Sequence, residues 1–294
     1  MLSLLRNPGR SVRCQAGFTL VEMVMVIVLA SVIVVMITTV MSRPLQGFVD
    51  QIRRAELVDL AASALNRMTR DIRLAVPNSL RVVGSTRLEL LRSPSGGRYR
   101  ASPVDGEGVR RDPPACTADP CVVEVLSPMI GIEDLDEFNW MVIYNIGGKA
   151  DGDNIWPPLN NAILANGTAI SVISPKVTVR YTQGKLSLSD GGVENFQFKY
   201  ASPQHRFFLA DKVVGYQCSG GQIVRGEFDS LELPGAYDYS RATPVVDHVD
   251  CANSGFTYSP DTHMRSSLVT VKLTLSQDGE TITLLQQVHV DNAP

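Results

Sequence analysis

The chain has 294 residues with 27 basic and 30 acidic side chains, so its formal net charge is −3. This mild acidic balance excludes the extended basic surface expected of a nucleic-acid-binding protein. The length leaves room for one large or two modest folded units. The composition is uneven along the chain, because one stretch near the N-terminus is almost entirely apolar.

The apolar stretch carries no formal charge from Met23 to Ser42. As a helix it would be about 30 Å long, the hydrocarbon thickness of a bilayer. Glu22 is the single carboxylate at its start, and three basic residues without an acid precede it: Arg6, Arg10 and Arg13. The pattern predicts a membrane-spanning helix that tethers a polar, cysteine-bearing body.

Three interpretations of this stretch are open. It is an ordinary single-pass anchor, in which Thr19 and Glu22 form a capping box before the apolar run. It is a secretory signal peptide, although the run is longer than the usual core of one and no small-x-small cleavage site follows. Or the chain is cleaved between Gly17 and Phe18, on the cytoplasmic side of the helix.

The residues Gly17-Phe-Thr-Leu-Val-Glu22 after a short basic leader resemble the prepilin processing motif of type IV pilins. The resemblance implies cleavage after Gly17 by a prepilin peptidase and N-methylation of Phe18. It divides the chain into a leader (1–17), a helix in the membrane or filament core (18–42) and a pilin-type head (43–294). The implied location is the bacterial inner membrane, with the N-terminus cytoplasmic, the head periplasmic, and incorporation into a surface pilus as a further step.

Glu22 is the residue on which the assembly hypothesis depends. An ionisable group inside an apolar segment costs on the order of 2.5–3.5 kcal/mol near the bilayer centre and is a functional hypothesis by default. In pilins that carboxylate pairs with the N-terminal amine of a neighbouring subunit. The resemblance therefore makes Glu22 the acceptor and the nitrogen of Phe18 the donor. The alternative is local, with Glu22 capping its own helix.

The cysteines indicate an oxidising compartment. Cys14 lies in the leader, and the other four form an even set: Cys116, Cys121, Cys218 and Cys251. Disulfides persist in a periplasm, and four cysteines allow three pairings. We favour 116–121 and 218–251, since each pair is close in sequence and flanked by turn residues. Metal binding is the alternative, but the Cys-x4-Cys spacing lacks the second close pair that zinc requires.

Beyond the membrane, apolar residues recur at steps of three and four up to Val76-Pro77, which predicts an amphipathic helix over 45–76. Alternating apolar residues then predict strands at 80–83, 87–91, 122–126, 141–145, 177–181, 196–200, 207–209, 213–216, 223–225, 268–275 and 281–290. Segments 93–120 and 230–260 are predicted to be loops. The expected fold class is α+β, with an antiparallel sheet packed on the second half of the long helix.

The chain carries no recognised catalytic or cofactor-binding motif, so neither an enzyme nor a cofactor is expected. Asp247-His248-x-Asp250 is compatible with a metal or a general base, but a histidine among loop acids is common at surfaces. Asp151-Gly-Asp153 is compatible with a calcium loop, but the downstream bidentate glutamate is missing. A membrane-anchored periplasmic enzyme that uses such a loop site remains the third hypothesis for function.

Several later stretches resemble minor pilins of the mannose-sensitive haemagglutinin (MSHA) pilus. They lie at 57–61, 70–79, 96–100, 201–208 and 287–294. A head of this size also suits a minor subunit better than a major one. The resemblance implies a minor pilin that takes part in pilus assembly, with other pilin subunits and the inner membrane as partners. The alternative is a J-type minor pseudopilin of type II secretion, which shares the large-head architecture.

Overall fold

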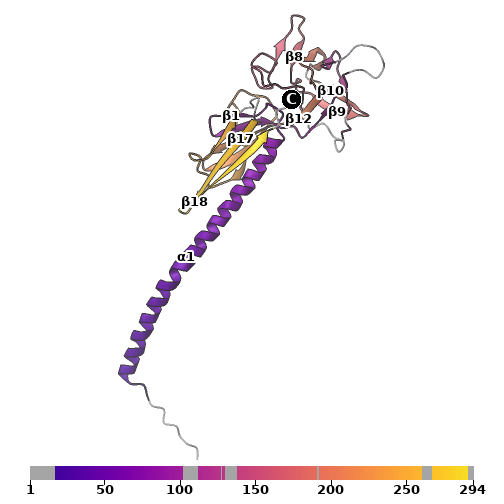
Figure 1. The fold of residues 1–294 in the computed structure, drawn as a ribbon. Coiled ribbons are helices and arrows are strands. Elements are labelled where there is room, and N and C mark those ends of the chain that lie inside the picture. The colour runs from indigo at the N-terminus through magenta and orange to yellow at the C-terminus, as the bar shows by residue number, and fades with distance from the viewer. Residues whose placement is uncertain are drawn as a thin grey trace, which may run out of the picture. The chain divides into compact units, whose positions relative to one another are not determined.

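The computed structural model describes residues 17–101, 112–126, 128–129, 138–190, 192–259 and 267–290. The leader up to Ala16, with Cys14, lies outside the described residues, as does the end of the tail after Val290. The chain divides into two compact units, Met1–Arg53 and Arg54–Pro294, each of which is described by itself. The α+β fold class is confirmed, because a long N-terminal helix precedes a head built mainly from antiparallel strands (Figure 1).

Helix α1 runs from Leu20 to Arg73, and its end differs from the prediction of 76. The last turn tightens, since the amide of Leu74 donates to the carbonyls of both Arg70 and Asp71. The chain then joins the head sheet before Pro77 is reached, because the amide of Val76 donates to the carbonyl of Leu91 at 2.9 Å. Pairing with a strand therefore ends the helix ahead of the proline.

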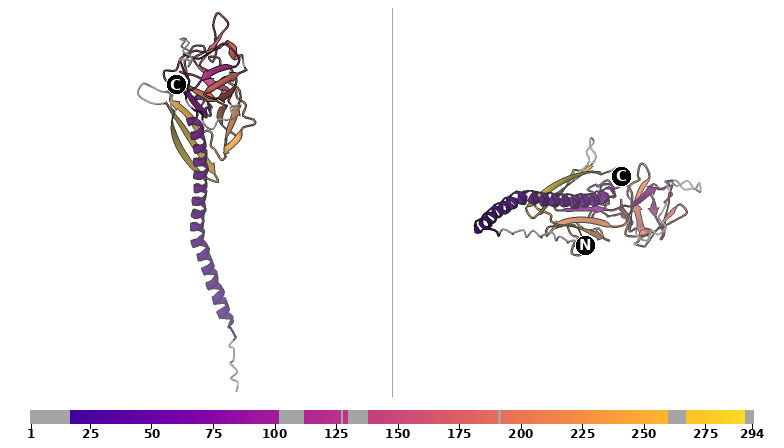
Figure 2. Two further views of the ribbon diagram at one scale, coloured as in Figure 1. Left: turned by 90° about the vertical axis from the view of Figure 1, so that its right-hand side faces the viewer. Right: turned by 90° about the horizontal axis from the view of Figure 1, so that it is seen from below.

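The part of α1 that belongs to the second unit buries one stripe, as the apolar spacing predicts. Its buried residues are Leu57, Ala61, Ala64, Leu65, Met68 and Ile72. They pack against strands of two different sheets, and Figure 2 shows strands β17 and β18 beside these turns. Phe48, Val49 and Ile52 continue the same spacing toward the N-terminus but are exposed, and they belong to the first unit.

The two sheets that cover this part of α1 are antiparallel. The larger has the order β1-β2-β13-β14-β15, with bounds Arg81–Val83, Arg87–Leu91, Val213–Ser219, Gln222–Phe228 and Thr243–Val246. The smaller has the order β16-β17-β18, with bounds Gly255–Ser259, Ser267–Gln277 and Glu280–Val290. The predicted hairpins at 80–91 and 268–290 are both present, and Gly84 and Gly279 take the positive φ that their turns require.

Three smaller sheets form the rest of the second unit. They are β5-β10-β9 (Cys121–Glu124, Lys185–Ser189, Thr178–Thr182), β4-β11-β8-β7 (Ala115–Cys116, Phe196–Phe198, Ala169–Ser171, Ala162–Ile163) and β3-β12-β6 (Ser95–Arg98, Arg206–Ala210, Trp140–Val142). A short 3-10 helix, η2, spans Val193–Asn195. Strands β8 and β11 pair in parallel, whereas the prediction had one antiparallel sheet. A separate apolar core, with Phe196, Phe198 and Phe207 among its members, lies between these strands.

The predicted loops contain strands that the sequence pattern did not indicate. Strands β3 and β4 fall within 93–120, and β15 and β16 within 230–260. Strand β3 has the sequence Ser-Gly-Gly-Arg, which has little β propensity, and it forms because all four residues pair with β12. Strand β15 contains Pro244, which is tolerated because β15 is the edge strand of its sheet.

Candidate functional site

The start of α1 has the geometry of a capped helix terminus. Residues Gly17 to Thr19 precede the helix without regular structure. The hydroxyl of Thr19 accepts a hydrogen bond from the amide of Glu22 at 3.3 Å, and the carbonyl of Thr19 accepts one from the amide of Met23 at 3.1 Å. Thr19 is therefore the N-cap, and this is the threonine half of the predicted capping box.

Glu22 lies in the first turn of α1, one turn after Phe18, and its side chain is exposed. The helix dipole favours a carboxylate at this end. Phe18 is also exposed, with 77% of its surface accessible. In the described structure the two predicted assembly residues are thus both open to a partner. Cleavage after Gly17, methylation of Phe18 and intersubunit pairing of Glu22 stay predictions.

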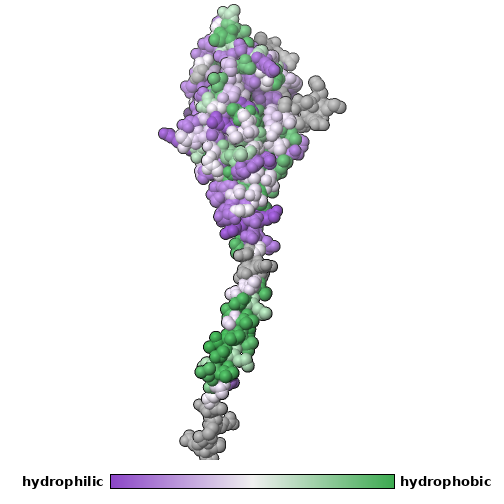
Figure 3. All heavy atoms as spheres, turned by 90° about the vertical axis from the view of Figure 1, so that its left-hand side faces the viewer, coloured by the Kyte–Doolittle hydropathy of each residue, from purple (hydrophilic) through white to green (hydrophobic). Residues whose placement is uncertain are grey.

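The segment that follows has the properties of a membrane-spanning helix. From Leu20 to Val40, 21 residues have a mean hydropathy of 3.0, and none of this surface is buried within the protein. Figure 3 shows hydrophobic side chains gathered along this part of α1. The hydroxyls of Ser31 and Thr38 donate to carbonyls of the preceding turn, so these polar groups are satisfied inside the helix. Such a surface is stable only against lipid or against other apolar helices.

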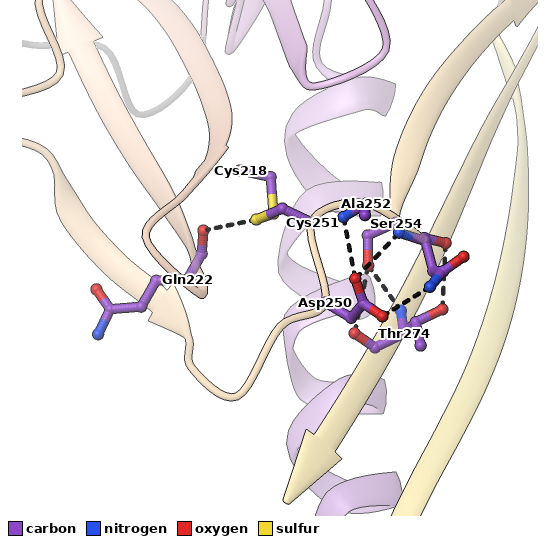
Figure 4. The surroundings of a disulfide bond; sticks show 8 residues. Cys218, Gln222, Asp250, Cys251, Ala252, Ser254 and Thr274 are labelled. Atoms are coloured by element: carbon purple, nitrogen blue, oxygen red, sulfur yellow. Dashed lines mark hydrogen bonds between the residues drawn. A yellow bond between two sulfur atoms is a disulfide. The ribbon is translucent and has the colours of Figure 1, made fainter.

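Both favoured cysteine pairs are bonded in the structure. Cys116–Cys121 has a Cα–Cα distance of 5.0 Å and joins β4 to β5. Cys218–Cys251 has a Cα–Cα distance of 5.7 Å and ties β13 to the segment before β16 (Figure 4). The second disulfide ties β13 of the larger sheet to the connection between β15 and β16, which leads from the larger sheet into the smaller one. These cysteines therefore have a structural role in the head.

The Asp247-His248-x-Asp250 segment does not assemble a compact site. His248 Nε2 is 3.9 Å from Asp247 Oδ2, and both side chains are exposed. Asp250 instead accepts hydrogen bonds from the amides of Ala252 and Asn253 and from the side chain of Asn253, as Figure 4 shows in part. Only the Asp250 side chain is thus engaged in the turn that contains Cys251, while Asp247 and His248 are exposed.

The Asp151-Gly-Asp153 loop holds an ammonium group where a calcium loop would hold a cation. Asp153 is buried, with Lys199 Nζ at 2.5 Å from its Oδ1 and the hydroxyl of Tyr200 at 2.8 Å. The hydrogen bond from Lys199 lowers the pKa of Asp153 below its ordinary value of 3.8, against the effect of burial. Among the residues that the structure describes, no group of three or more His, Cys, Asp or Glu side chains is placed to hold a metal ion.

A buried polar cluster that sequence analysis missed fixes the end of α1 to the head. Asp71 Oδ2 accepts from Arg225 Nε and from the hydroxyl of Tyr216, both at 2.6 Å. Arg225 also donates to Glu227 at 2.5 Å. Burial and the bond to Asp71 raise the pKa of Tyr216, so it remains a neutral donor. The sequence carries no signal for this cluster, because Asp71 is about 150 positions from its partners.

Comparisons with known proteins agree with the N-terminal geometry. Residues 12–38 match the family described as the prokaryotic N-terminal methylation motif. The match covers Gly17, Phe18 and Glu22 and supports a pilin-type protein, for which the motif implies processing by a prepilin peptidase and association with other pilins. Together with the apolar helix it indicates membrane anchoring. The comparisons with curated proteins and with solved structures found no match.

Proposed function

We propose that this chain is a minor subunit of an MSHA-like type IV pilus, similar to the O-type minor pilin of that system. It is cleaved after Gly17, methylated at Phe18 and stacked into the filament through its apolar helix. The single observation that carries the proposal is the methylation motif at residues 12–38, which coincides with an unburied apolar helix of membrane-spanning length at 20–40. The head of the chain, with two disulfides, is suited to a periplasmic or extracellular setting.

The chemistry of the proposed assembly lies in one ion pair. Glu22 is costly in lipid as an isolated charge, on the order of 2.5–3.5 kcal/mol near the bilayer centre. The amine that cleavage frees at Phe18 is costly there for the same reason. When helices stack, the Phe18 amine of one subunit forms an ion pair with the Glu22 carboxylate of another. Entry into the filament therefore offsets the free energy of placing each isolated charge in an apolar environment. Binding, not catalysis, is therefore the proposed activity.

The second candidate is a J-type minor pseudopilin of type II secretion, which would use the same helix and the same pair. The observation that favours a minor subunit in either machine is the large head, with strands in five sheets among the described residues. The two functions differ in their neighbours. Deletion of the gene is expected to abolish surface pili in the first case and secretion of folded periplasmic proteins in the second.

The proposal is tested by the N-terminal residue of the protein in cells with and without the prepilin peptidase. We expect methylated Phe18 in the first strain and an unprocessed chain in the second. Glu22→Leu should insert into the membrane normally but be lost from sheared filaments, whereas Glu56→Leu, an exposed position on the same helix, should enter them as the wild type does. An unprocessed chain in the peptidase-positive strain, or normal entry of Glu22→Leu, contradicts the proposal.

A further inference from the structure

A basic cavity of about 450 Å³ lies in the second unit, where α1 ends. Its walls come from the end of α1 and the turn after it, from β3, from β12, and from the last residue of β18. Three arginines line it: Arg73, Arg98 and Arg206. None of the described residues that line it is acidic. This concentration of positive charge stands out in a chain whose acids outnumber its bases.

The register of two strands explains why the charge is concentrated. Arg206 on β12 lies directly opposite Arg98 on β3, so both side chains leave the same face of the sheet. Like charges at directly opposed positions destabilise a sheet. Arg98 has another polar contact within the chain, so the inference rests on Arg206 and Arg73. Arg73 adds its charge from the last turn of α1.

The rest of the cavity is lined by apolar side chains and by the glycines of β3. Gly96 lies opposite Phe208, and a Cβ at Gly96 would be 2.7 Å from the carbonyl oxygen of Phe207. Strands β3 and β12 therefore approach too closely at this point for any residue but glycine. Phe208, Pro77 and Val290 supply apolar lining. A site of this kind suits a carboxylate on an aliphatic stem better than a bare inorganic anion, because both parts of the side chain find a matching surface.

We propose that this cavity binds carboxylate side chains from an acidic segment of a neighbouring pilin-type subunit. Arginine is the residue suited to such contacts, since its planar guanidinium donates two parallel hydrogen bonds to a carboxylate. The volume accommodates a few side chains and not a folded domain, so the partner presents a short exposed segment. The identity of the partner rests on the proposed function, whereas the acidic-peptide chemistry of the cavity does not.

The chemistry is tested with the full chain in detergent micelles and a labelled hexaglutamate peptide. We expect saturable binding that weakens with added salt. Arg206→Gln should weaken binding at least about tenfold, as loss of a charge-assisted pair does. Arg180→Gln is the matched control, since Arg180 is an exposed strand arginine outside the cavity, and it should bind as the wild type does. Near-ultraviolet circular dichroism of each variant verifies the fold, and Phe208→Leu gives a second variant that reduces the apolar lining.

Three results would overturn the chemistry: no binding of hexaglutamate, equal loss in the Arg206 and Arg180 variants, or displacement of the peptide by an equal concentration of inorganic phosphate. In cells, a photocrosslinking residue in place of Phe208 should capture an Asp- or Glu-rich peptide of another pilin-type subunit, and Arg206→Gln should reduce this capture. Capture of lipid alone, or of no protein, overturns the partner. A correctly processed N-terminus with no peptide binding refutes this inference and leaves the proposed function unchanged. An unprocessed chain that binds the peptide contradicts the proposed function and leaves the acidic-peptide chemistry of the cavity unchanged.

Discussion

Replacement of Asp71 is expected to loosen the end of α1 from the head. The Asp71 side chain is only 9% exposed, as is that of Arg225, and Tyr216 is fully buried. Asp71→Leu keeps the branched shape of the side chain but leaves Arg225 Nε and the hydroxyl of Tyr216 without their shared acceptor. Asp71 lies on the last turns of α1 and its two partners lie on β13 and β14, so this cluster is a buried polar contact within the second unit.

The expected cost is worked from the two hydrogen bonds that are lost. Each bond to a charged group contributes about 1.5–3 kcal/mol. Breaking a buried ion pair by removing one partner costs about 3–5 kcal/mol. Glu227 still accepts from Arg225 in the variant, so the lower end applies, about 3 kcal/mol. For a folded unit of this size that corresponds to a fall in Tm of about 6–12 °C.

The measurement is thermal unfolding of the full chain in detergent micelles, followed by near-ultraviolet circular dichroism of Trp140 and Trp156. Both tryptophans are buried in the head, so the signal is insensitive to the apolar helix. Tyr216→Phe, which removes one of the two bonds and keeps the ion pair, should lose about half as much stability. The double variant Asp71→Leu with Arg225→Met should recover part of the loss, since no buried charge is left unpaired. A loss below about 1 kcal/mol for Asp71→Leu would refute the reasoning.

Three further predictions follow from the head. Replacing Cys218 and Cys251 with serine should lower the free energy of unfolding by up to about 4 kcal/mol, measured by urea titration, because their bond closes a loop of 33 positions. Met68→Ala should cost about 2–5 kcal/mol in the same assay, since Met68 is fully buried between α1 and the sheets. Because the folded-state pKa of Asp153 is lowered, its pairing with Lys199 stabilises the head above its ordinary pKa and is lost as pH falls through the lowered value. Lys199→Met should therefore make stability less dependent on pH between about 5 and 2; an unchanged dependence contradicts the assignment.

Features that depend on neighbours in sequence were predicted with few errors. The capped start of α1 follows from Thr19 three residues before Glu22, and the apolar segment follows from composition alone. The terminal hairpin follows from alternation around an Asp-Gly turn. Pro77 predicts that α1 ends at 76, whereas the helix ends at Arg73 because Val76 pairs with Leu91.

Features that depend on long-range pairing had no local signal. The sequence Ser-Gly-Gly-Arg of β3 does not predict a strand. The strand forms because β12, more than 100 positions later, pairs with it. No local pattern connects Arg98 with Arg206, and only the register of β3 and β12 places them on one face of a cavity. Asp71 likewise has no local signal of its burial, because its partners Tyr216 and Arg225 lie far along the chain.

The methylation motif, the membrane-length helix, the α+β class and the spacing of the buried stripe could all be predicted from the amino-acid sequence, because they depend on the periodicity and chemistry of adjacent residues. Which arginines lie opposite each other, where α1 ends and which aspartate of α1 is buried all depend on long-range packing. The physical reason is that burial and strand register are set by the free energy of the whole head, to which positions far apart in the chain contribute together.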